Sequence, residues 1–236
     1  MIVIPMLGHS SRFFRAGYTL PKHQLPLNSE TVFSQSVRSF ERYFEDTPFL
    51  FLVRNDYGNL EFVCNQIKGL QIRDFRIIEF SAETRGQAES VALGIQDYKN
   101  ATPLTIFTID TIRYGFEMPP PEHIGDGFLE VFEGDGDGWS FVKPGVGNTV
   151  IQTAEKERIS NLCSNGLYYF SKISLFRQAY KHYLNQGLSV NGELYIAPLY
   201  NLLIQDGKDI RFNLIEKGEI DHCGIPKDYE YVRSKC

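Results

Sequence analysis

The sequence predicts a single α/β domain whose mixed, mostly parallel central sheet is flanked by helices. Short apolar runs alternate with amphipathic segments along the first half of the chain, which is the pattern of parallel strands joined by helices. The 236 residues suffice for a sizeable core. Hydrophobic residues make up 42% and charged residues 22% of the sequence, a balance typical of globular proteins.

The first half of the chain is predicted to contain four strands separated by helices. The apolar run Ile2–Met6 is typical of a strand buried on both faces, as in a parallel sheet. Further strands are predicted at residues 49–53, 75–80 and 104–109, and helices at residues 31–43, 60–70 and 87–98. This alternation predicts right-handed βαβ units.

The second half is predicted to be richer in strands. Residues 127–153 contain strand-like segments that glycine turns interrupt, including residues 139–143 and 149–153. A further strand is predicted at 167–170, helices at 173–184 and 193–203, a late strand at 210–214 and a closing helix at 228–233. The glycine-rich run 134–138 lacks the spacing and the closing glutamate of a calcium loop, so we interpret it as a hairpin turn.

Composition excludes several classes of function. The net charge of −5 argues against nucleic acid as the main partner, because binding to a phosphate backbone needs a basic surface. No apolar stretch is long enough to span a bilayer, and the apolar start at residues 1–7 is too short for a signal peptide. The four scattered cysteines are expected to be free thiols in a reducing compartment. We therefore expect a cytoplasmic protein with no membrane partner.

The loop after the first strand contains residue types that bind phosphate. Gly8 allows a ligand close to the backbone, and free N–H groups near Ser10 and Ser11 can bind phosphate oxygens. Arg12 and Lys22 would add positive charge against a triphosphate. Ligands of open parallel sheets bind beyond the carboxyl ends of the strands, where this loop is expected. An ordinary surface loop is an equal alternative from residue types alone.

Asp110 follows the fourth predicted strand directly. A carboxylate at the end of a buried strand is well placed to hold a hard cation such as Mg²⁺, which prefers oxygen ligands and bridges to substrate phosphates. The alternative is a turn cap, since aspartate is common at such positions. The phosphate-type loop earlier in the chain favours the metal interpretation.

Two other segments contain polar groups suited to small-molecule recognition. Gly86 removes bulk beside Gln87, whose amide can donate to and accept from a nucleobase edge. Lys156 can meet a substrate phosphate and Glu155 can accept sugar hydroxyls, with Asn165 just before the next predicted strand. The alternatives are an ordinary helix N-terminus for the first segment and a solvated charge pair for the second.

Asp221 and His222 stand side by side near the end of the chain. Neighbouring side chains of a strand point to opposite faces, so they cannot both meet one ion there. We expect one of the two to face a functional cleft, and a loop cap is the alternative.

Taken in chain order, these segments resemble the sugar-phosphate nucleotidyltransferases, which have a GT-A-like, Rossmann-like fold. The resemblance covers nearly the whole chain and begins with the family signature L-x-x-G-x-G-x-R…P-K. The residues in that arrangement are Leu7, Gly8, Ser10, Ser11, Arg12, Pro21 and Lys22. Asp110 and the segments 86–88, 155–156, 165–168 and 224–226 match the later family motifs.

The resemblance implies a reaction in which a sugar phosphate, or a similar phosphorylated small molecule, attacks the α-phosphorus of an NTP and pyrophosphate leaves. It implies catalytic roles for Arg12, Lys22 and Asp110, and Mg²⁺ as cofactor, with Asp110, Asp221 and His222 as candidate ligands. Candidate nucleotide-binding residues are Met6, Leu7, Gly8, Ser10, Ser11, Arg12, Gly86 and Gln87; candidate substrate-binding residues are Glu155, Lys156 and Asn165.

The family also predicts how the chain is used. Residues 1–115 are expected to form a nucleotide-binding half and residues 116–236 a sugar-phosphate-binding half of one domain. The product would serve capsule or other surface-polysaccharide synthesis, and a homodimer is a family-level expectation. Neither the nucleobase nor the acceptor is specified by these residues.

Two departures from the family pattern keep other functions open. Ser10 stands where the family has its second glycine, and His222 stands where it has a second metal-binding aspartate. A GT-A glycosyltransferase is one alternative, although such enzymes usually have a D-x-D motif and the segment after the fourth strand lacks it. A nucleotide-binding module without activity is the other.

Overall fold

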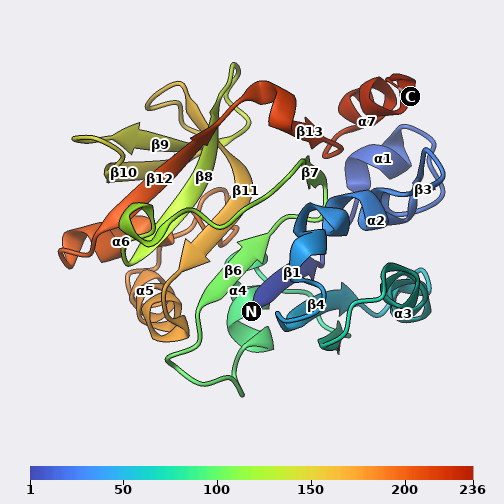
Figure 1. Ribbon diagram of the computed structural model, residues 1–236, viewed down its shortest axis with the longest axis horizontal. Helices are drawn as coiled ribbons and strands as arrows, with labels where there is room; N and C mark the ends of the chain where they lie inside the picture. The colour runs from blue at the N-terminus through green and yellow to red at the C-terminus, as the bar shows by residue number, and fades with distance from the viewer. Residues whose placement is uncertain (236) are drawn as a thin grey trace. The chain divides into compact units, whose positions relative to one another are not determined.

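The computed structural model describes residues 1–235, and the chain folds as two compact units. The unit called here the N-terminal unit comprises Ile2–Glu83, Thr108–Glu117 and the chain from Gly218 onward. The central unit comprises Thr84–Phe107 and Met118–Lys217, together with Met1. Figure 1 labels most of the helices and strands of both units.

A parallel ladder of three strands forms the core of the N-terminal unit. β1 (Ile2–Met6) pairs with β4 (Phe49–Arg54), which pairs with β5 (Phe75–Phe80), all in parallel. All of β1 is buried, and all of β4 except its last residue, Arg54, is buried too, as their continuous apolar sequences predict. β5 lies at the edge, and its charged residues hinder pairing with another chain.

The other elements of this unit are short. The strands are β2 (Pro26–Leu27) paired with β3 (Glu30–Thr31), and β7 (Thr111–Arg113) paired with β13 (Ile220–His222). The helices are α1 (Ser11–Arg15), α2 (Val32–Val37), α3 (Asn59–Leu70) and α7 (Pro226–Ser234), with 3-10 turns at Lys22–Gln24, Arg38–Tyr43 and Lys217–Glu219. The predicted helix 31–43 is therefore divided, and Phe40 has non-helical angles of φ −111° and ψ 21°.

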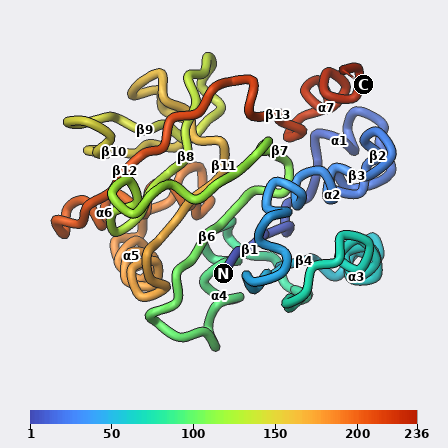
Figure 2. Tube along the Cα trace, viewed as in Figure 1, coloured from blue at the N-terminus to red at the C-terminus, as the bar shows by residue number. Residues whose placement is uncertain are grey.

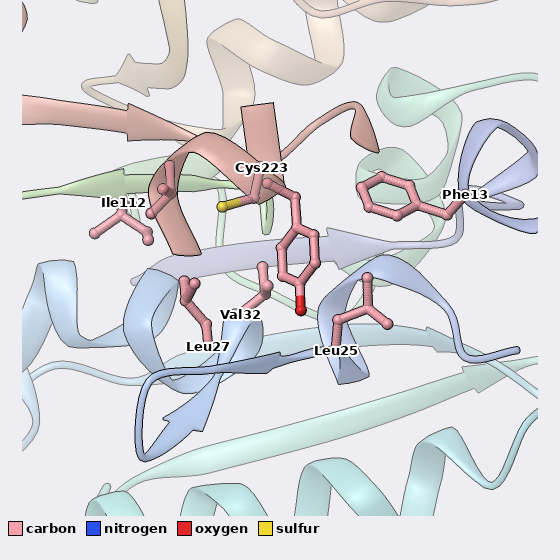
Figure 3. Packing of buried hydrophobic residues seen from close by; sticks show 8 residues of the cluster. Phe13, Leu25, Leu27, Val32, Ile112 and Cys223 are labelled. Carbon is pink, nitrogen blue, oxygen red and sulfur yellow. The ribbon is translucent and has the colours of Figure 1, made fainter. Parts of the chain in front are cut away.

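Segments from both ends of the sequence share one apolar cluster in the N-terminal unit. Its buried members are Phe13, Leu25, Leu27, Val32, Ile112, Cys223, Tyr229 and Val232, and Figure 3 shows how most of them pack. Polar contacts reinforce the cluster, because the Tyr229 hydroxyl donates to the Pro26 carbonyl at 2.6 Å. In Figures 1 and 2 the last helix, α7, lies beside the loop that carries α1.

Strand β11 (Leu162–Phe170) organises the central unit, and all nine of its residues are buried. It pairs antiparallel with β6 (Leu104–Phe107), β8 (Gly127–Glu133) and β9 (Ser140–Pro144). β10 (Val150–Glu155) extends β9 in antiparallel fashion, and β12 (Ile210–Ile215) runs parallel to β8. The unit also contains α4 (Gln87–Gly94), α5 (Ile173–Asn185), α6 (Leu199–Gln205) and a 3-10 turn at Pro121–His123. The predicted α/β class is confirmed, with a parallel ladder from the first half of the chain.

One helix prediction is wrong at its start. The helix predicted at 193–203 begins only at Leu199, directly after Pro198. Proline disfavours helical angles in the residue before it, and the backbone of Leu194 bonds instead to Arg85 and Ala88. The segment before Pro198 is therefore a connection that fixes the start of α4.

The described cysteines confirm the expected free thiols: Cys64, Cys163 and Cys223 form no disulfide, and Cys236 lies outside the described residues. Within residues 1–235, no helix combines the length and the apolar character needed to cross a membrane.

Candidate active site

The loop that follows β1 turns sharply at Ser10, which has φ 51° and ψ 26°. This left-handed conformation suits glycine better than serine. The Ser10 carbonyl accepts the Phe13 N–H at 2.9 Å, so that α1 begins here and carries Arg12 on its exposed first turn. Gly8 is exposed, with open space around its α-carbon. The loop therefore offers accessible backbone and one guanidinium to an anionic ligand.

The other residues predicted for this loop differ in exposure. Met6 ends β1 with only 3% of its surface exposed. Leu7 is half-buried and Ser11 is exposed.

The structure brings two of the predicted catalytic residues together. The Lys22 ammonium lies 2.5 Å from the Asp110 carboxylate, and each side chain is 22% exposed. Burial would raise the pKa of the Asp110 carboxyl, but the charge and hydrogen bond of Lys22 outweigh that effect, and the pKa is lowered. The lowered pKa favours the ionised carboxylate of Asp110, and both side chains remain partly accessible from solvent.

The segment after β13 closes around Asp110. The Cys223 N–H donates to the Asp110 carbonyl at 2.7 Å. A methyl group at Gly224 would lie 3.0 Å from Oδ2 of Asp110, closer than most carbon–oxygen contacts. Glycine at this position therefore lets the chain pass directly beside the carboxylate.

Asp221 and His222 point to opposite sides of β13, as strand geometry predicts. The Asp221 carboxylate binds the Lys235 ammonium at 2.5 Å and accepts the Tyr114 hydroxyl at 2.9 Å. His222 instead lies 3.4 Å from the Thr111 hydroxyl, in the field of Asp110. Burial lowers the pKa of the His222 imidazole, against the opposing charge of Asp110. Of the two neighbours, Asp221 is therefore held by Lys235 and Tyr114, while the His222 imidazole lies beside Thr111.

A second group of predicted residues lies in the central unit. Gly86 precedes α4 with φ 136°, and a methyl group there would lie 2.7 Å from the backbone of Leu194. The Ala88 N–H donates to the Leu194 carbonyl at 2.9 Å. Gln87 is half-buried between them as the first residue of α4. Glycine is required at position 86 both by its angles and by this close backbone contact.

Glu155 ends β10, Lys156 follows it directly, and the two side chains make separate contacts. The Lys156 ammonium hydrogen-bonds the Tyr195 hydroxyl and lies 4.5 Å from the centre of the same ring. Glu155 accepts the Ser140 hydroxyl, and burial raises the pKa of its carboxyl. Tyr195 follows Leu194 directly, so the segment that packs on Gly86 also holds Lys156. Sequence reasoning missed Tyr195, because nothing in the residues 193–198 marks a ligand or a partner for position 156.

Asn165 is buried inside β11, where it is 2% exposed. Its amide donates to Oε1 of Glu130 at 2.7 Å, and its oxygen accepts the Leu167 N–H at 3.0 Å. The pairing of β11 with β8 shifts between Ser164 and Tyr168, which accommodates this local bond. In this conformation Asn165 supports the strand and Glu130.

The chemistry of these side chains fits one type of metal binding. No cluster of three or more acidic, histidine or cysteine side chains that could hold a metal occurs among residues 1–235. In nucleotide sites, Mg²⁺ is usually bound by one or two carboxylates, substrate phosphates and water. A single ionised carboxylate, Asp110, next to a phosphate-type loop fits that scheme, whereas a histidine nitrogen is not a preferred Mg²⁺ ligand.

Comparison with known proteins finds similar chains among solved structures. No protein-family model and no curated protein matches the chain. Among solved structures, the chain is similar to the nucleoside-diphosphate-sugar pyrophosphorylase from Vibrio cholerae RC9, at 49% sequence identity and a TM-score of 0.94, over 99% of this chain and 100% of that chain.

Two more distant structures share the fold. One is the inositol-1-phosphate CTP transferase from T. maritima, at 14% identity and a TM-score of 0.75, over 99% of this chain and 94% of that chain. The other is a UDP-glucose pyrophosphorylase complexed with UDP-glucose, at 13% identity and a TM-score of 0.77, over 99% of this chain and 97% of that chain.

Proposed function

The chain belongs to the family of the nucleoside-diphosphate-sugar pyrophosphorylases, which are nucleotidyltransferases, and we propose that it joins an NTP to a sugar phosphate or a similar phosphorylated small molecule. A phosphate oxygen of the acceptor attacks the α-phosphorus of the NTP. The bond between the α-phosphorus and the bridging oxygen breaks, and pyrophosphate leaves with the electron pair. Product and leaving group conserve all atoms, and no covalent enzyme intermediate is needed.

The observation that supports this proposal most strongly is the Lys22–Asp110 pair. Lys22 ends the family signature, and Asp110 matches the metal-binding aspartate of the family. Their ammonium and carboxylate lie 2.5 Å apart beside the turn at Ser10. An ammonium held in a half-buried position can stabilise negative charge that develops on phosphoryl oxygens, because it needs little reorganisation.

We assign the following roles to the remaining residues of the N-terminal unit. The exposed backbone at Gly8 and the guanidinium of Arg12 bind triphosphate oxygens. Asp110 would hold Mg²⁺, which neutralises phosphate charge when bound. His222 shapes the surroundings of Asp110, and Asp221 is a structural anchor through Lys235.

In the central unit we assign substrate recognition to two segments. Gln87 recognises the nucleobase, since its amide can both donate and accept. Lys156 binds the acceptor phosphate, and Glu155 accepts acceptor hydroxyls. Support comes from the placement of both charged groups at the end of β10 and from the Tyr195 contact that fixes the ammonium. Asn165 contributes to substrate recognition indirectly, through its hydrogen bond to Glu130.

We also propose a pathway, a cellular compartment and an oligomeric state. By analogy with the family, the product would enter capsule or other surface-polysaccharide synthesis, in the cytoplasm, with the enzyme as a homodimer. Cell fractionation, gel filtration with light scattering and analysis of surface glycans in a deletion strain would each test one of these points.

Pyrophosphate release tests the reaction itself. The protein is incubated with each NTP, Mg²⁺ and a panel of sugar 1-phosphates, and pyrophosphate is measured by a coupled assay. We expect release with at least one pair, and a loss of about 100-fold or more in Lys22→Ala and Asp110→Asn. Lys68→Ala and Asp74→Asn serve as matched controls, because both residues are exposed in the same unit.

Other outcomes point to other functions. Transfer or hydrolysis of a nucleotide sugar, without pyrophosphate release from any pair, would favour a glycosyltransferase. Nucleotide binding without turnover would favour an inactive module. Activity that is unchanged in Asp110→Asn would contradict the role assigned to Asp110.

A further inference from the structure

Ser10 departs from the family at the turn where glycine is expected, and its side chain has a partner. Its Oγ accepts the backbone N–H of Lys22 at 3.0 Å, across 12 residues of sequence. Glycine would adopt φ 51° with less strain but has no atom to accept this bond. We propose that Ser10 is a positioning residue, whose hydroxyl fixes the backbone of Lys22 and thereby aims its ammonium at the reacting phosphates.

Three contacts of the same loop carry this inference. The Ser10 carbonyl accepts the N–H groups of Phe13 and Phe14 at 2.9 and 3.2 Å, which fixes the start of α1. The Ser10 hydroxyl fixes Lys22 at 3.0 Å. One residue therefore sets both the helix that carries Arg12 and the backbone that carries Lys22. Ser10 therefore fixes the backbone positions of both Arg12 and Lys22, whose cations are proposed to face the triphosphate.

The length of the lysine side chain makes a fixed backbone important. Its four-carbon stem rotates freely, so the ammonium position is defined only if both ends are held. Asp110 holds the ammonium end at 2.5 Å, and Ser10 holds the backbone end. Loss of the hydroxyl would let the 3-10 turn Lys22–Gln24 shift on its Lys22 side, and small shifts of a reacting group lower rates strongly.

Two substitutions separate positioning from stability. Ser10→Ala removes the hydroxyl and keeps the left-handed strain, whereas Ser10→Gly removes both. We expect kcat to fall about tenfold in both variants, with the KM for NTP within about twofold of wild type. The melting temperature should fall by about 2–4 °C in Ser10→Ala and clearly less in Ser10→Gly. Equal kcat losses at unequal stability would identify a positioning role.

Thr31→Ala is the matched control. The Thr31 hydroxyl also accepts a backbone N–H in the same unit, that of Ser34 at 3.2 Å, and it caps α2. Its hydrogen bonds go to Ser34 and Gln66 and not to Lys22. We expect its melting temperature to fall by about 2–4 °C with kcat unchanged. If Thr31→Ala loses as much kcat as the Ser10 variants for the same fall in melting temperature, the kcat loss reflects stability alone and the inference is overturned.

Amide hydrogen exchange tests the hydrogen bond between the Lys22 N–H and the Ser10 hydroxyl without any enzymatic turnover. The kinetic expectation rests on the proposed function, but protection of the Lys22 N–H does not. NMR or mass-spectrometric exchange should show this amide exchanging at least tenfold faster in both Ser10 variants and unchanged in Thr31→Ala. If wild type releases no pyrophosphate, the proposed function fails while the exchange result still stands. Unchanged exchange at Lys22, or faster exchange with normal kcat, would overturn the positioning role.

Discussion

Stability of the protein should depend on pH through the buried imidazole of His23. This residue follows Lys22 and is 3% exposed. Its Nε2 lies 2.7 Å from Oδ1 of Asn59, which also accepts the amide of Gln24 at 2.9 Å. Asn59 in turn donates to Asp56 at 2.9 Å. The oxygen of Asn59 requires a donor, so neutral His23 with a proton on Nε2 satisfies the network.

The magnitude follows from the pKa of this imidazole. Burial lowers the pKa of His23 from 6.5 to about 4, against an opposing contribution from the bond to Asn59. The unfolded chain therefore binds the proton more tightly, and stability is lost as the pH falls through the window between these two values. The free energy of unfolding should decrease by about 2 kcal/mol between pH 7 and pH 5, and by about 3 kcal/mol once the folded state is also protonated.

Urea unfolding across this pH range measures the effect. His23→Gln keeps an N–H donor for Asn59 but does not titrate, so its free energy of unfolding should vary with pH by about 2 kcal/mol less than that of wild type between pH 7 and pH 5. His123→Gln, at an exposed position, should parallel wild type. Far-UV circular dichroism is the suitable signal, because the sole tryptophan, Trp139, lies in the central unit. Parallel curves for His23→Gln and wild type would refute the reasoning.

Three further substitutions follow from single contacts. Gly224→Ala should lower kcat by roughly tenfold or more in the pyrophosphate assay, because the new methyl group would lie 3.0 Å from Asp110; normal kcat would show that Asp110 tolerates displacement. Gly86→Ala should lower the free energy of unfolding by about 2–4 kcal/mol in urea titrations, since its methyl group would lie 2.7 Å from the Leu194 backbone, and a loss below about 1 kcal/mol would contradict this contact. Tyr195→Phe should raise the KM for the sugar phosphate several-fold with little change in kcat, because the ring beneath Lys156 is kept but the hydroxyl is lost; an unchanged KM would exclude Tyr195 from holding Lys156.

Strands that are buried on both faces were the most predictable elements. Ile2–Met6 was predicted with its observed bounds, since a continuous apolar run has few other uses in a globular protein. The short strand β7 was not predicted, because three residues carry no periodicity and its partner, Ile220–His222, lies far along the chain. The helix that begins at Leu199 is predicted to start too early, at residue 193, because the apolar spacing before Pro198 resembles that of a helix.

The sequence marks candidate residues for the site, but it does not show the contacts that these residues make. Strand alternation implies that Asp221 and His222 point apart, but not which groups each of them contacts. Asp221 is held by Lys235 and Tyr114, which have no sequence signature. The bond from Lys22 to the Ser10 hydroxyl was equally invisible, since sequence shows only that a glycine is replaced.

The N-terminal unit is assembled from segments that are far apart in translation. Its last piece, from Gly218 onward, supplies β13, which pairs with β7, and Gly224, which lies against Asp110. A ribosome makes β1 and the Ser10 turn well before this piece emerges. The nascent chain therefore cannot enclose Asp110 until synthesis has passed Gly224, and a premature stop codon after residue 217 would leave this carboxylate without its closing segment. Such products would contain the sequences of β1, β4 and β5 but lack Cys223, Tyr229 and Val232, which belong to the apolar cluster of the unit.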